Sequence, residues 1–265
     1  MNAGAQLGLG CARLAGGREA AASRRLVETA LALGIRHFDT APYYGDGWSE
    51  HVLGDVLHGV DDVTVTTKIG ISRPVAPTSV GPAHRAYRTI VKPVLARFPK
   101  TKARLLAALQ TRRPSQPDPS RRPFPLDSVE AELEASLRAL RRDRVDRFLV
   151  HEPDQFFPLE DEAAATFERL RVQGMIAEYG LGYDREVADP QGFGTVLQSR
   201  YLSPERRTDT GVIRVFHGVL RHRDPVITAE VRLREVLAAE PEARVLLSVS
   251  TVQQLRQLHA AATDV

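Results

Sequence analysis

The chain has 265 residues, of which 43% are hydrophobic and 26% charged, and its formal net charge is +3. This balance excludes an intrinsically disordered chain, which would have fewer apolar residues and a more one-sided charge. The single cysteine, Cys11, excludes an internal disulfide and the usual cysteine-clustered zinc site. No apolar run reaches the ~18 residues of a membrane span, and the N-terminus lacks the features of a signal peptide. We therefore expect a cytoplasmic protein.

Short apolar runs alternate with longer amphipathic ones from residue 7 onward, which is typical of repeated βα units around a parallel sheet. Eight runs, mostly β-branched or aromatic, are predicted as strands: 7–10, 35–38, 63–67, 145–150, 175–180, 195–198, 212–216 and 244–247. Eight such units predict an α/β fold of the (β/α)8 (TIM) barrel type, which we expect to form a single domain over residues 1–265.

Helices are predicted where caps and apolar periodicity agree. Asp127 and Glu130 form a capping box ahead of a run with apolar residues on one face. Another helix carries Phe167 and Leu170 on one face, and Gly174 can close it in a left-handed C-cap directly before the next strand. Such tight connections indicate a compact barrel.

Residues 69–125 interrupt this alternation. They include 10 of the 17 prolines, 12 of the 36 lysines and arginines, and one of the 33 acidic residues. Because a loop after a barrel strand lies over the catalytic face, we interpret 69–125 as a long basic loop over that face. It is either a solvated, arginine-rich coil or a surface that attracts an anionic substrate. Few aromatic residues lie among the arginines, which argues against a nucleic-acid partner.

Four residues with complementary chemistry occur where predicted strands end. Asp39 and Tyr44 follow the second strand, Lys68 the third, and His151 the fourth. Since the C-terminal ends of barrel strands share one face, we expect a catalytic site there. Asp39 and Lys68 would together lower the pKa of Tyr44 from ~10, so that Tyr44 acts as a general acid toward a carbonyl oxygen. His151 would orient that oxygen by a hydrogen bond.

Each of the four also has a purely structural interpretation. An aspartate after a strand is most often a helix cap, and a tyrosine beside a glycine commonly packs in a turn. The lysine could be a solvated strand end, and the histidine a core residue. Together the four are specific for a catalytic site, because the chemistry requires all of them at one face.

In order and context these residues resemble the aldo-keto reductases. Residues 34–54 are similar to the second-strand signature of that family, and the resemblance extends more faintly over almost the whole chain. It implies a (β/α)8 barrel that binds NADPH or NADH and, without a metal, interconverts a carbonyl (aldehyde, ketone or sugar-like) and an alcohol. Tyr44 would be the general acid/base, and the partner a small molecule.

The resemblance also implies a set of cofactor-binding residues: Gly10, Cys11, Gln198, Phe216, Ser248, Ser250 and Gln254. Gln198 matches the glutamine of the family's sixth strand. Phe216 is the nearest candidate for the aromatic residue that stacks beneath the nicotinamide from the seventh strand, although the alignment there could slip by one residue. Gly182 and Tyr183 replace the Ser-Asn pair that holds the nicotinamide carboxamide.

Gln254 and Leu258 likewise replace an arginine and an asparagine near the adenosine phosphate. Thr251 and Gln254 form a capping box whose helix start could bind a phosphate or simply be an ordinary cap. The sequence therefore leaves two alternatives to a reductase: a binding or regulatory protein with impaired cofactor binding, or a barrel for redox-neutral proton transfer. It does not decide between NADP and NAD, or predict the substrate, the reaction direction or the oligomeric state.

Overall fold

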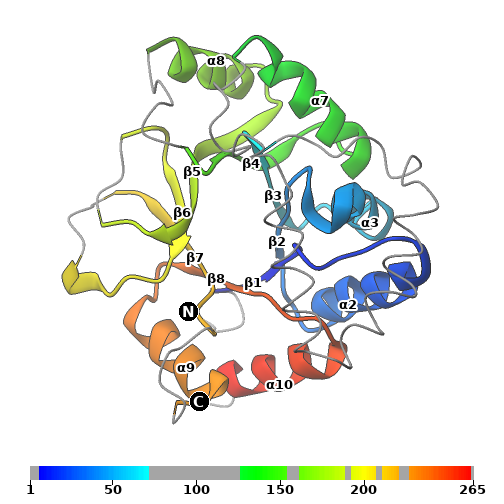
Figure 1. Cartoon of the computed structure of the whole chain (residues 1–265), viewed down its shortest axis with the longest axis vertical. Coiled ribbons are helices and arrows are strands. Elements are labelled where there is room, and N and C mark those ends of the chain that lie inside the picture. Colours follow the sequence, from blue (N-terminus) through cyan, green and yellow to red (C-terminus); the bar gives the residue numbers. More distant parts are fainter. Residues whose placement is uncertain are drawn as a thin grey trace, which may run out of the picture.

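The computed structural model describes residues 6–71, 126–153, 161–188, 192–206, 211–220 and 227–263. Eight parallel strands follow one another in chain order and close into a barrel, with helices around the outside (Figure 1). The strands are β1 (Leu7–Gly10), β2 (His37–Asp39), β3 (Thr64–Ile69), β4 (Val145–His151), β5 (Ile176–Glu186), β6 (Val196–Arg200), β7 (Ile213–His217) and β8 (Arg244–Leu247). The predicted (β/α)8 barrel is confirmed. Most of the predicted basic loop, 72–125, lies outside the described residues.

Helices follow most of the strands on the outside of the barrel, and among the described residues no α-helix lies between β5 and β7. They are α2 (Ala20–Ala32), α3 (Trp48–Val56), α7 (Val129–Leu140), α8 (Asp161–Val172), α9 (Ala229–Ala239) and α10 (Val252–Thr263), with short 3-10 helices η1 (Gly17–Glu19), η2 (Tyr44–Gly47), η6 (Leu126–Ser128) and η7 (Pro204–Arg206). Gly174, with a φ of +78°, follows α8 in the predicted left-handed conformation. Within the described ranges, no helix is both long and apolar enough to cross a membrane.

Strand β5 differs most from its predicted bounds, because it runs on to Glu186 rather than ending at Gly180. Gly180 and Gly182 both lie within the strand. A Cβ at Gly180 would lie 1.8 Å from the carbonyl oxygen of Val196, so the close approach of β6 requires glycine there. Pairing of β5 with β6 then shifts register between Gly182 and Glu186.

Side chains on the strands alternate between the two sides of the barrel wall. Phe38, Phe148 and Phe216 face outward and belong to a large hydrophobic cluster that includes many helix residues. A second cluster contains only strand residues and therefore fills the inside of the barrel: Leu149, Val196, Val215 and Leu246. Asp39 and His217 each follow an outward-facing phenylalanine, so both face inward at the C-terminal end of the barrel.

Candidate active site

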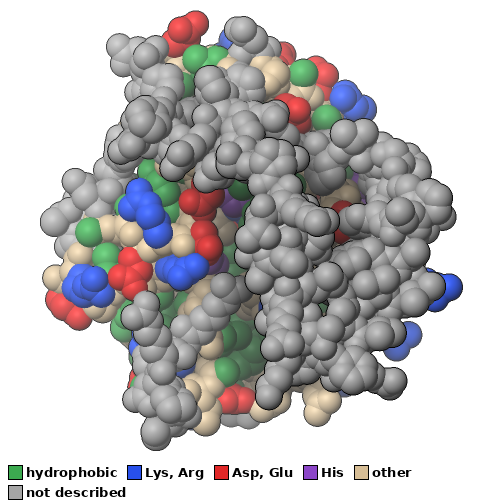
Figure 2. All heavy atoms as spheres, viewed as in Figure 1, with side chains coloured by type: hydrophobic (Ala, Val, Ile, Leu, Met, Phe, Trp, Pro, Cys, Tyr) green, Lys and Arg blue, Asp and Glu red, His purple; other side chains and the backbone are tan. Residues whose placement is uncertain are grey.

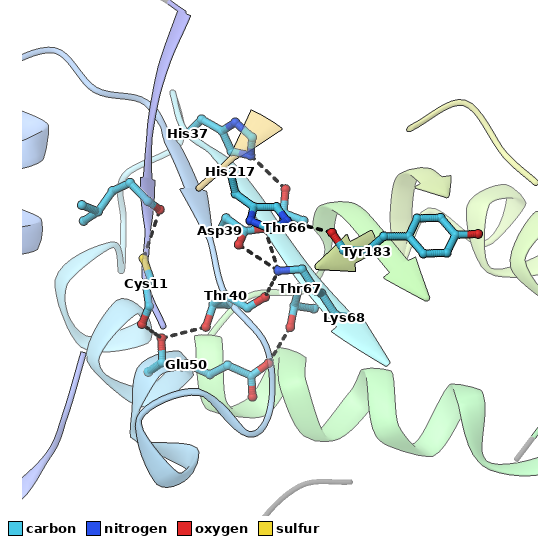
Figure 3. A network of polar contacts seen from close by, with 12 residues as sticks. Cys11, His37, Asp39, Thr40, Glu50, Thr66, Thr67, Lys68, Tyr183 and His217 are labelled. Atoms are coloured by element: carbon cyan, nitrogen blue, oxygen red, sulfur yellow. Dashed lines mark hydrogen bonds and ion pairs between the residues drawn. The ribbon is translucent and has the colours of Figure 1, made fainter. Parts of the chain in front are cut away.

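An ion pair between Lys68 and Asp39 forms the floor of the site (Figure 3). Lys68 Nζ lies 2.7 and 2.8 Å from the two carboxylate oxygens of Asp39, and it donates a third hydrogen bond to the carbonyl oxygen of Thr40 at 2.9 Å. The two side chains are only 2% and 4% exposed. Because an ammonium group has three N–H donors, all of them are satisfied, and the position of Lys68 is fixed.

Polar side chains at the start of α3 tie this floor to the surrounding strands (Figure 3). Ser49 Oγ donates to the carbonyl oxygen of Cys11 at 3.0 Å and lies 2.8 Å from Thr40 Oγ1. Thr67 Oγ1, next to the lysine, donates to the buried carboxylate of Glu50 at 2.7 Å. The first turn of α3 therefore holds the ends of β1, β2 and β3 in fixed relation.

Tyr44 and His151 lie above the ion pair. Lys68 Nζ is 4.9 Å from the centroid of the Tyr44 ring. The centroids of the His151 and Tyr44 rings are 5.9 Å apart, and the two ring planes make an angle of 85°. The structure thus brings together the four residues that the sequence singled out. Their roles in catalysis stay predictions.

The predicted lowering of the Tyr44 pKa is wrong. Burial raises the pKa of Tyr44 well above its usual value, and the negative charge of Asp39 raises it further. Lys68 contacts both carboxylate oxygens of Asp39, so little net positive charge is left to act on the phenol. The side chain of Tyr43, whose ring contacts that of Tyr44, lowers the pKa in part. The sequence analysis did not consider Tyr43, although the adjacent pair of tyrosines was visible.

His151 is held in its neutral form. Burial lowers the pKa of His151 well below its usual value, and the nearby cations Lys68 and protonated His217 would lower it further. Its Nδ1 atom is buried without a hydrogen-bond partner among the described residues. A neutral imidazole keeps one N–H donor and one acceptor, so His151 can still donate to an oxygen in the site.

The turn that carries Tyr44 depends on Gly45. This residue has a φ of +60°, and an added Cβ would lie 1.7 Å from the carbonyl oxygen of Leu14. We expect Gly45→Ala to lower the free energy of unfolding by more than about 2 kcal/mol and to abolish turnover, because the turn must move. Gly59→Ala is the matched control, since Gly59 has a φ of +74° with nothing within 4 Å of its added Cβ. Equal stability loss in both variants, measured by urea denaturation, would contradict the clash.

Across the barrel, Gln198 presents an unsatisfied acceptor. The amide oxygen Oε1 of Gln198 is buried without a hydrogen-bond partner among the described residues. Gly182 pairs with Gln198 between β5 and β6, and a Cβ at Gly182 would meet nothing closer than this oxygen at 3.5 Å. Because Gly182 has no side chain, there is space next to Gln198 Oε1. An amide N–H of a ligand could reach this acceptor through that space. The side chain of Tyr183 points away from the site (Figure 3).

His217, rather than Phe216, faces the site from β7. Phe216 is fully buried in the outer hydrophobic cluster, where the centroid of its ring lies 5.2 Å from that of Tyr201. A ring enclosed in this way has no face for a ligand, so its placement does not fit the predicted stacking role. His217 Nε2 lies 2.7 Å from the carbonyl oxygen of Tyr183, and burial lowers the pKa of His217.

Gly10 is the last residue of β1, and Cys11 follows it. Of the two, only Gly10 lies against another residue that was predicted to bind the cofactor. Cys11 is fully buried, its thiol donates to the carbonyl oxygen of Leu9 at 3.3 Å, and burial raises its pKa. The thiol therefore has no exposed surface for a cofactor. Gly10 lies against Ser248, since an added Cβ would be 2.9 Å from Ser248 Oγ.

The start of α10 is capped by its own side chains. The backbone N–H of Gln254 donates to Thr251 Oγ1 at 3.2 Å, and the backbone N–H of Ser250 donates to Gln254 Oε1 at 3.1 Å. These bonds support the cap interpretation. Arg13, in the loop after β1, donates to Ser250 Oγ at 2.9 Å. Arg13 thus places a cationic group at the start of α10, and the sequence analysis did not single out this residue.

A cavity of about 890 Å³ connects the tyrosines with this arginine. It is lined by residues of the loops after β1, β2 and β8 together with residues of α2, among them Arg13, Leu26, Tyr43, Tyr44 and Ser250. One elongated ligand could therefore contact both ends of the site. Among the described residues, no group of three histidine, cysteine, aspartate or glutamate side chains is arranged to hold a metal ion.

Charges of both signs lie at the rim. Arg200 pairs with Asp184 at 3.0 Å, and Glu152, whose φ is +51°, accepts a hydrogen bond from the backbone N–H of Asp184. Figure 2 shows acidic and basic side chains next to one another over β5, β6 and η7. This part of the rim therefore does not present a single sign of charge to a ligand.

Comparison with known proteins identifies relatives of one kind. Residues 6–189 match the family model described as the aldo/keto reductase family. The D-threo-aldose 1-dehydrogenase of a Pseudomonas species is 29% identical over 59% of this chain and 42% of its own length. The rat aflatoxin B1 aldehyde reductase member 2 is 27% identical over 74% of this chain and 44% of its own length. The matched part is thus less than half of either curated relative.

Among solved structures, an aldo-keto reductase from Klebsiella pneumoniae in complex with NADPH superimposes with a TM-score of 0.61. The superposition covers 98% of this chain and 86% of that protein, at 18% sequence identity. At this identity the likeness shows a shared fold.

Proposed function

The chain belongs to the aldo/keto reductase family, and from this we propose that it is an NAD(P)H-dependent oxidoreductase that interconverts a carbonyl compound and an alcohol. The observation that carries the proposal is the group of Tyr44, the Lys68–Asp39 ion pair and neutral His151 at the ends of neighbouring strands. A phenol, a buried cation and a neutral imidazole around one space suit proton transfer to a carbonyl oxygen.

The described residues fit a nicotinamide cofactor. Gln198 Oε1, which has no hydrogen-bond partner in the described part of the chain, lies beside the space at Gly182 and can accept a hydrogen bond from a carboxamide N–H. His217 faces the same space from β7 and offers an aromatic ring in place of Phe216. A bound cofactor would supply the hydride.

Tyr44 would act as the general acid in this reaction. Its raised pKa keeps the hydroxyl protonated through the neutral range, so it can give its proton to the carbonyl oxygen during reduction. Asp39 holds the Lys68 ammonium 4.9 Å from the ring, and this ammonium offsets part of the negative charge of Asp39 that would otherwise oppose the phenolate. His151 donates a hydrogen bond that orients the carbonyl.

A pH dependence follows from the direction of the Tyr44 pKa. A raised pKa keeps the acid form present to higher pH, so we expect the rate of reduction to stay level from neutral pH to about pH 9. Oxidation requires the phenolate and should rise about tenfold per unit of pH over the same range. Both rates can be measured as kcat against pH. An oxidation rate that is already level at neutral pH would contradict the assignment.

We also propose that Arg13 takes the place of the missing basic groups around an adenosine 2′-phosphate. It lies beside Ser250 at the start of α10 and lines the same cavity as Tyr44. Arg13→Ala should weaken NADPH binding about fivefold and leave NADH binding unchanged, as loss of one exposed ionic contact predicts. Isothermal titration with both cofactors measures this, and an equal effect on the two would refute the role of Arg13. Arg18→Ala, an exposed arginine of η1, is the control.

Turnover on a panel of carbonyl compounds tests the proposed function. The names of the two curated relatives refer to an aldose and to an aldehyde, so the panel should contain sugars, aliphatic aldehydes and aromatic aldehydes. We expect oxidation of NADPH or NADH that depends on one of these compounds and disappears in Tyr44→Phe. Turnover that persists in Tyr44→Phe would remove this residue as the acid.

A further inference from the structure

Residues 40–49 form a loop that carries Tyr44 into the site through a strained turn. Gly45, Asp46 and Gly47 have φ angles of +60°, +57° and +88°. A residue with a side chain rarely adopts this left-handed region, so the conformation of Asp46 costs free energy that other contacts must offset. The position of Tyr44, which directly precedes these residues, therefore depends on what holds the ends of the loop.

The two ends of this loop are joined by a hydrogen bond between side chains, which we call the Thr40–Ser49 clasp. Thr40 Oγ1 lies 2.8 Å from Ser49 Oγ, and both residues are fully buried. Ser49 has one hydroxyl hydrogen and donates it to the carbonyl oxygen of Cys11 at 3.0 Å. The Thr40 hydroxyl must therefore be the donor toward Ser49.

Thr40 also binds the lysine of the site. Its backbone carbonyl oxygen accepts a hydrogen bond from Lys68 Nζ at 2.9 Å (Figure 3). Its backbone N–H donates to the carbonyl oxygen of Thr66, on β3, at 2.8 Å. One residue therefore connects the loop that carries Tyr44 with the ammonium group that lies 4.9 Å from the Tyr44 ring.

The backbone hydrogen bonds within the loop are local. The N–H of Tyr44 donates to the carbonyl oxygen of Ala41 at 3.0 Å, and the N–H of Trp48 donates to the carbonyl oxygens of Gly45 and Tyr44. These bonds shape the turn, but each spans only two to four residues. Among these contacts, the Thr40–Ser49 clasp is the one that joins the two ends of the loop.

We propose that Thr40 is a positioning residue, whose hydroxyl closes the strained loop through Ser49 and thereby keeps Tyr44 in place over Lys68 for proton transfer. This inference rests on the proposed function for its meaning in catalysis. The effect of the clasp on the loop itself requires neither substrate nor cofactor. A proton donor that is displaced from its acceptor slows the chemical step, because proton transfer requires hydrogen-bond distance.

Hydrogen–deuterium exchange of the purified full chain tests the clasp directly. Thr40→Val replaces the hydroxyl by a methyl group of similar size and keeps the backbone carbonyl that binds Lys68. The amides of residues 41–48 should exchange about fivefold faster in Thr40→Val, as loss of one hydrogen bond predicts, and at the native rate in Thr40→Ser. Thr29→Val is the matched control, because the Thr29 hydroxyl donates to the carbonyl oxygen of Arg25 within α2.

Ser49→Ala removes the same bond from the other end of the loop, and it should accelerate exchange of the same amides. It therefore decides the question if Thr40→Val does not fold. Native exchange of residues 41–48 in a folded variant that lacks the clasp would overturn the proposal.

Kinetics give a second and separate measurement. In Thr40→Val, kcat for carbonyl reduction should fall about tenfold while KM for the cofactor changes little, and Thr40→Ser should recover most of the loss. Thr29→Val should keep native kcat. Native kcat in a Thr40→Val protein whose loop exchanges faster would overturn the positioning role. If the native protein shows no turnover, the proposed function fails while hydrogen exchange still decides the clasp.

A double variant tests whether the two hydroxyls act as one unit. Thr40→Val/Ser49→Ala should have about the same kcat as Ser49→Ala, because the second change removes a bond that is already lost. Losses in kcat that multiply would show that the two hydroxyls act independently, which would contradict the clasp.

Discussion

Tyr44→Phe is expected to lower kcat for carbonyl reduction about 10²- to 10⁴-fold while cofactor affinity stays within about twofold. The change removes one hydroxyl and keeps the ring that contacts Tyr43 and His151, so the site remains packed. Only the proton donor is lost. Steady-state kinetics together with a cofactor titration measure the two effects.

Tyr179→Phe is the control for the loss of a tyrosine hydroxyl elsewhere in the barrel, and it should keep native turnover. Tyr44→Phe with native kcat would show that another group donates the proton. Parallel loss of cofactor binding and turnover would instead indicate that the hydroxyl serves in binding.

Lys68→Met is expected to abolish turnover and to lower the free energy of unfolding by about 3–5 kcal/mol at neutral pH. The reason is the partner that remains: Asp39 is only 3% exposed, and without the ammonium its carboxylate is buried without a counter-charge. Urea denaturation followed by circular dichroism gives the stability, and steady-state kinetics give the activity.

The double variant Asp39→Asn/Lys68→Met separates the two effects. It removes both charges together and should regain much of the stability that Lys68→Met loses, yet remain without activity because the ammonium is missing. A double variant no more stable than the single one would contradict the ion pair as the source of the loss. An active double variant would contradict the catalytic role of Lys68.

The position of the four candidate catalytic residues was predictable because the fold converts sequence order into spatial proximity. Each follows or ends a predicted strand, and in a parallel barrel all strand ends of one kind share a face. Eight apolar runs were enough to predict that face. No knowledge of exact strand bounds was needed, because a shift of one or two residues still leaves Asp39, Lys68 and His151 at the same end.

Residues that depend on strand phase were not predictable in the same way. Side chains alternate across the barrel wall with a period of two, so an uncertainty of one residue exchanges the inside for the outside. This is why Phe216 was chosen over His217. Strand β5 was predicted too short, since the sequence does not show that the nearby backbone of β6 requires Gly180 within the strand.

The shift in the pKa of Tyr44 was predicted in the wrong direction. Burial and Asp39 raise this pKa and a free lysine charge would lower it, and a sequence does not show which influence is larger. The types of charge around the phenol were visible, but burial and the closeness of the Lys68–Asp39 contact were not. The same holds for the contact between the rings of Tyr43 and Tyr44. Whether residues 72–125 attract an anionic substrate stays a prediction.

The cofactor side of the site follows a different pattern from the catalytic side. The family resemblance implies a pair of polar side chains where this chain has Gly182 and Tyr183. The structure has space beside Gly182 and, next to it, the Gln198 oxygen that lacks a partner among the described residues. Arg13, in the loop after β1, reaches the start of α10, which follows the neighbouring strand β8. Cofactor binding by this arrangement is therefore the central claim of the proposed function.

Titration of the purified protein with NADPH and with NADH, followed by nicotinamide fluorescence, tests this claim most directly. We predict saturable binding of at least one cofactor, retained in Tyr44→Phe and weakened in Gln198→Leu, which removes the buried acceptor without changing charge. Failure of both cofactors to bind at millimolar concentration would contradict the account, however complete the group around Tyr44 is.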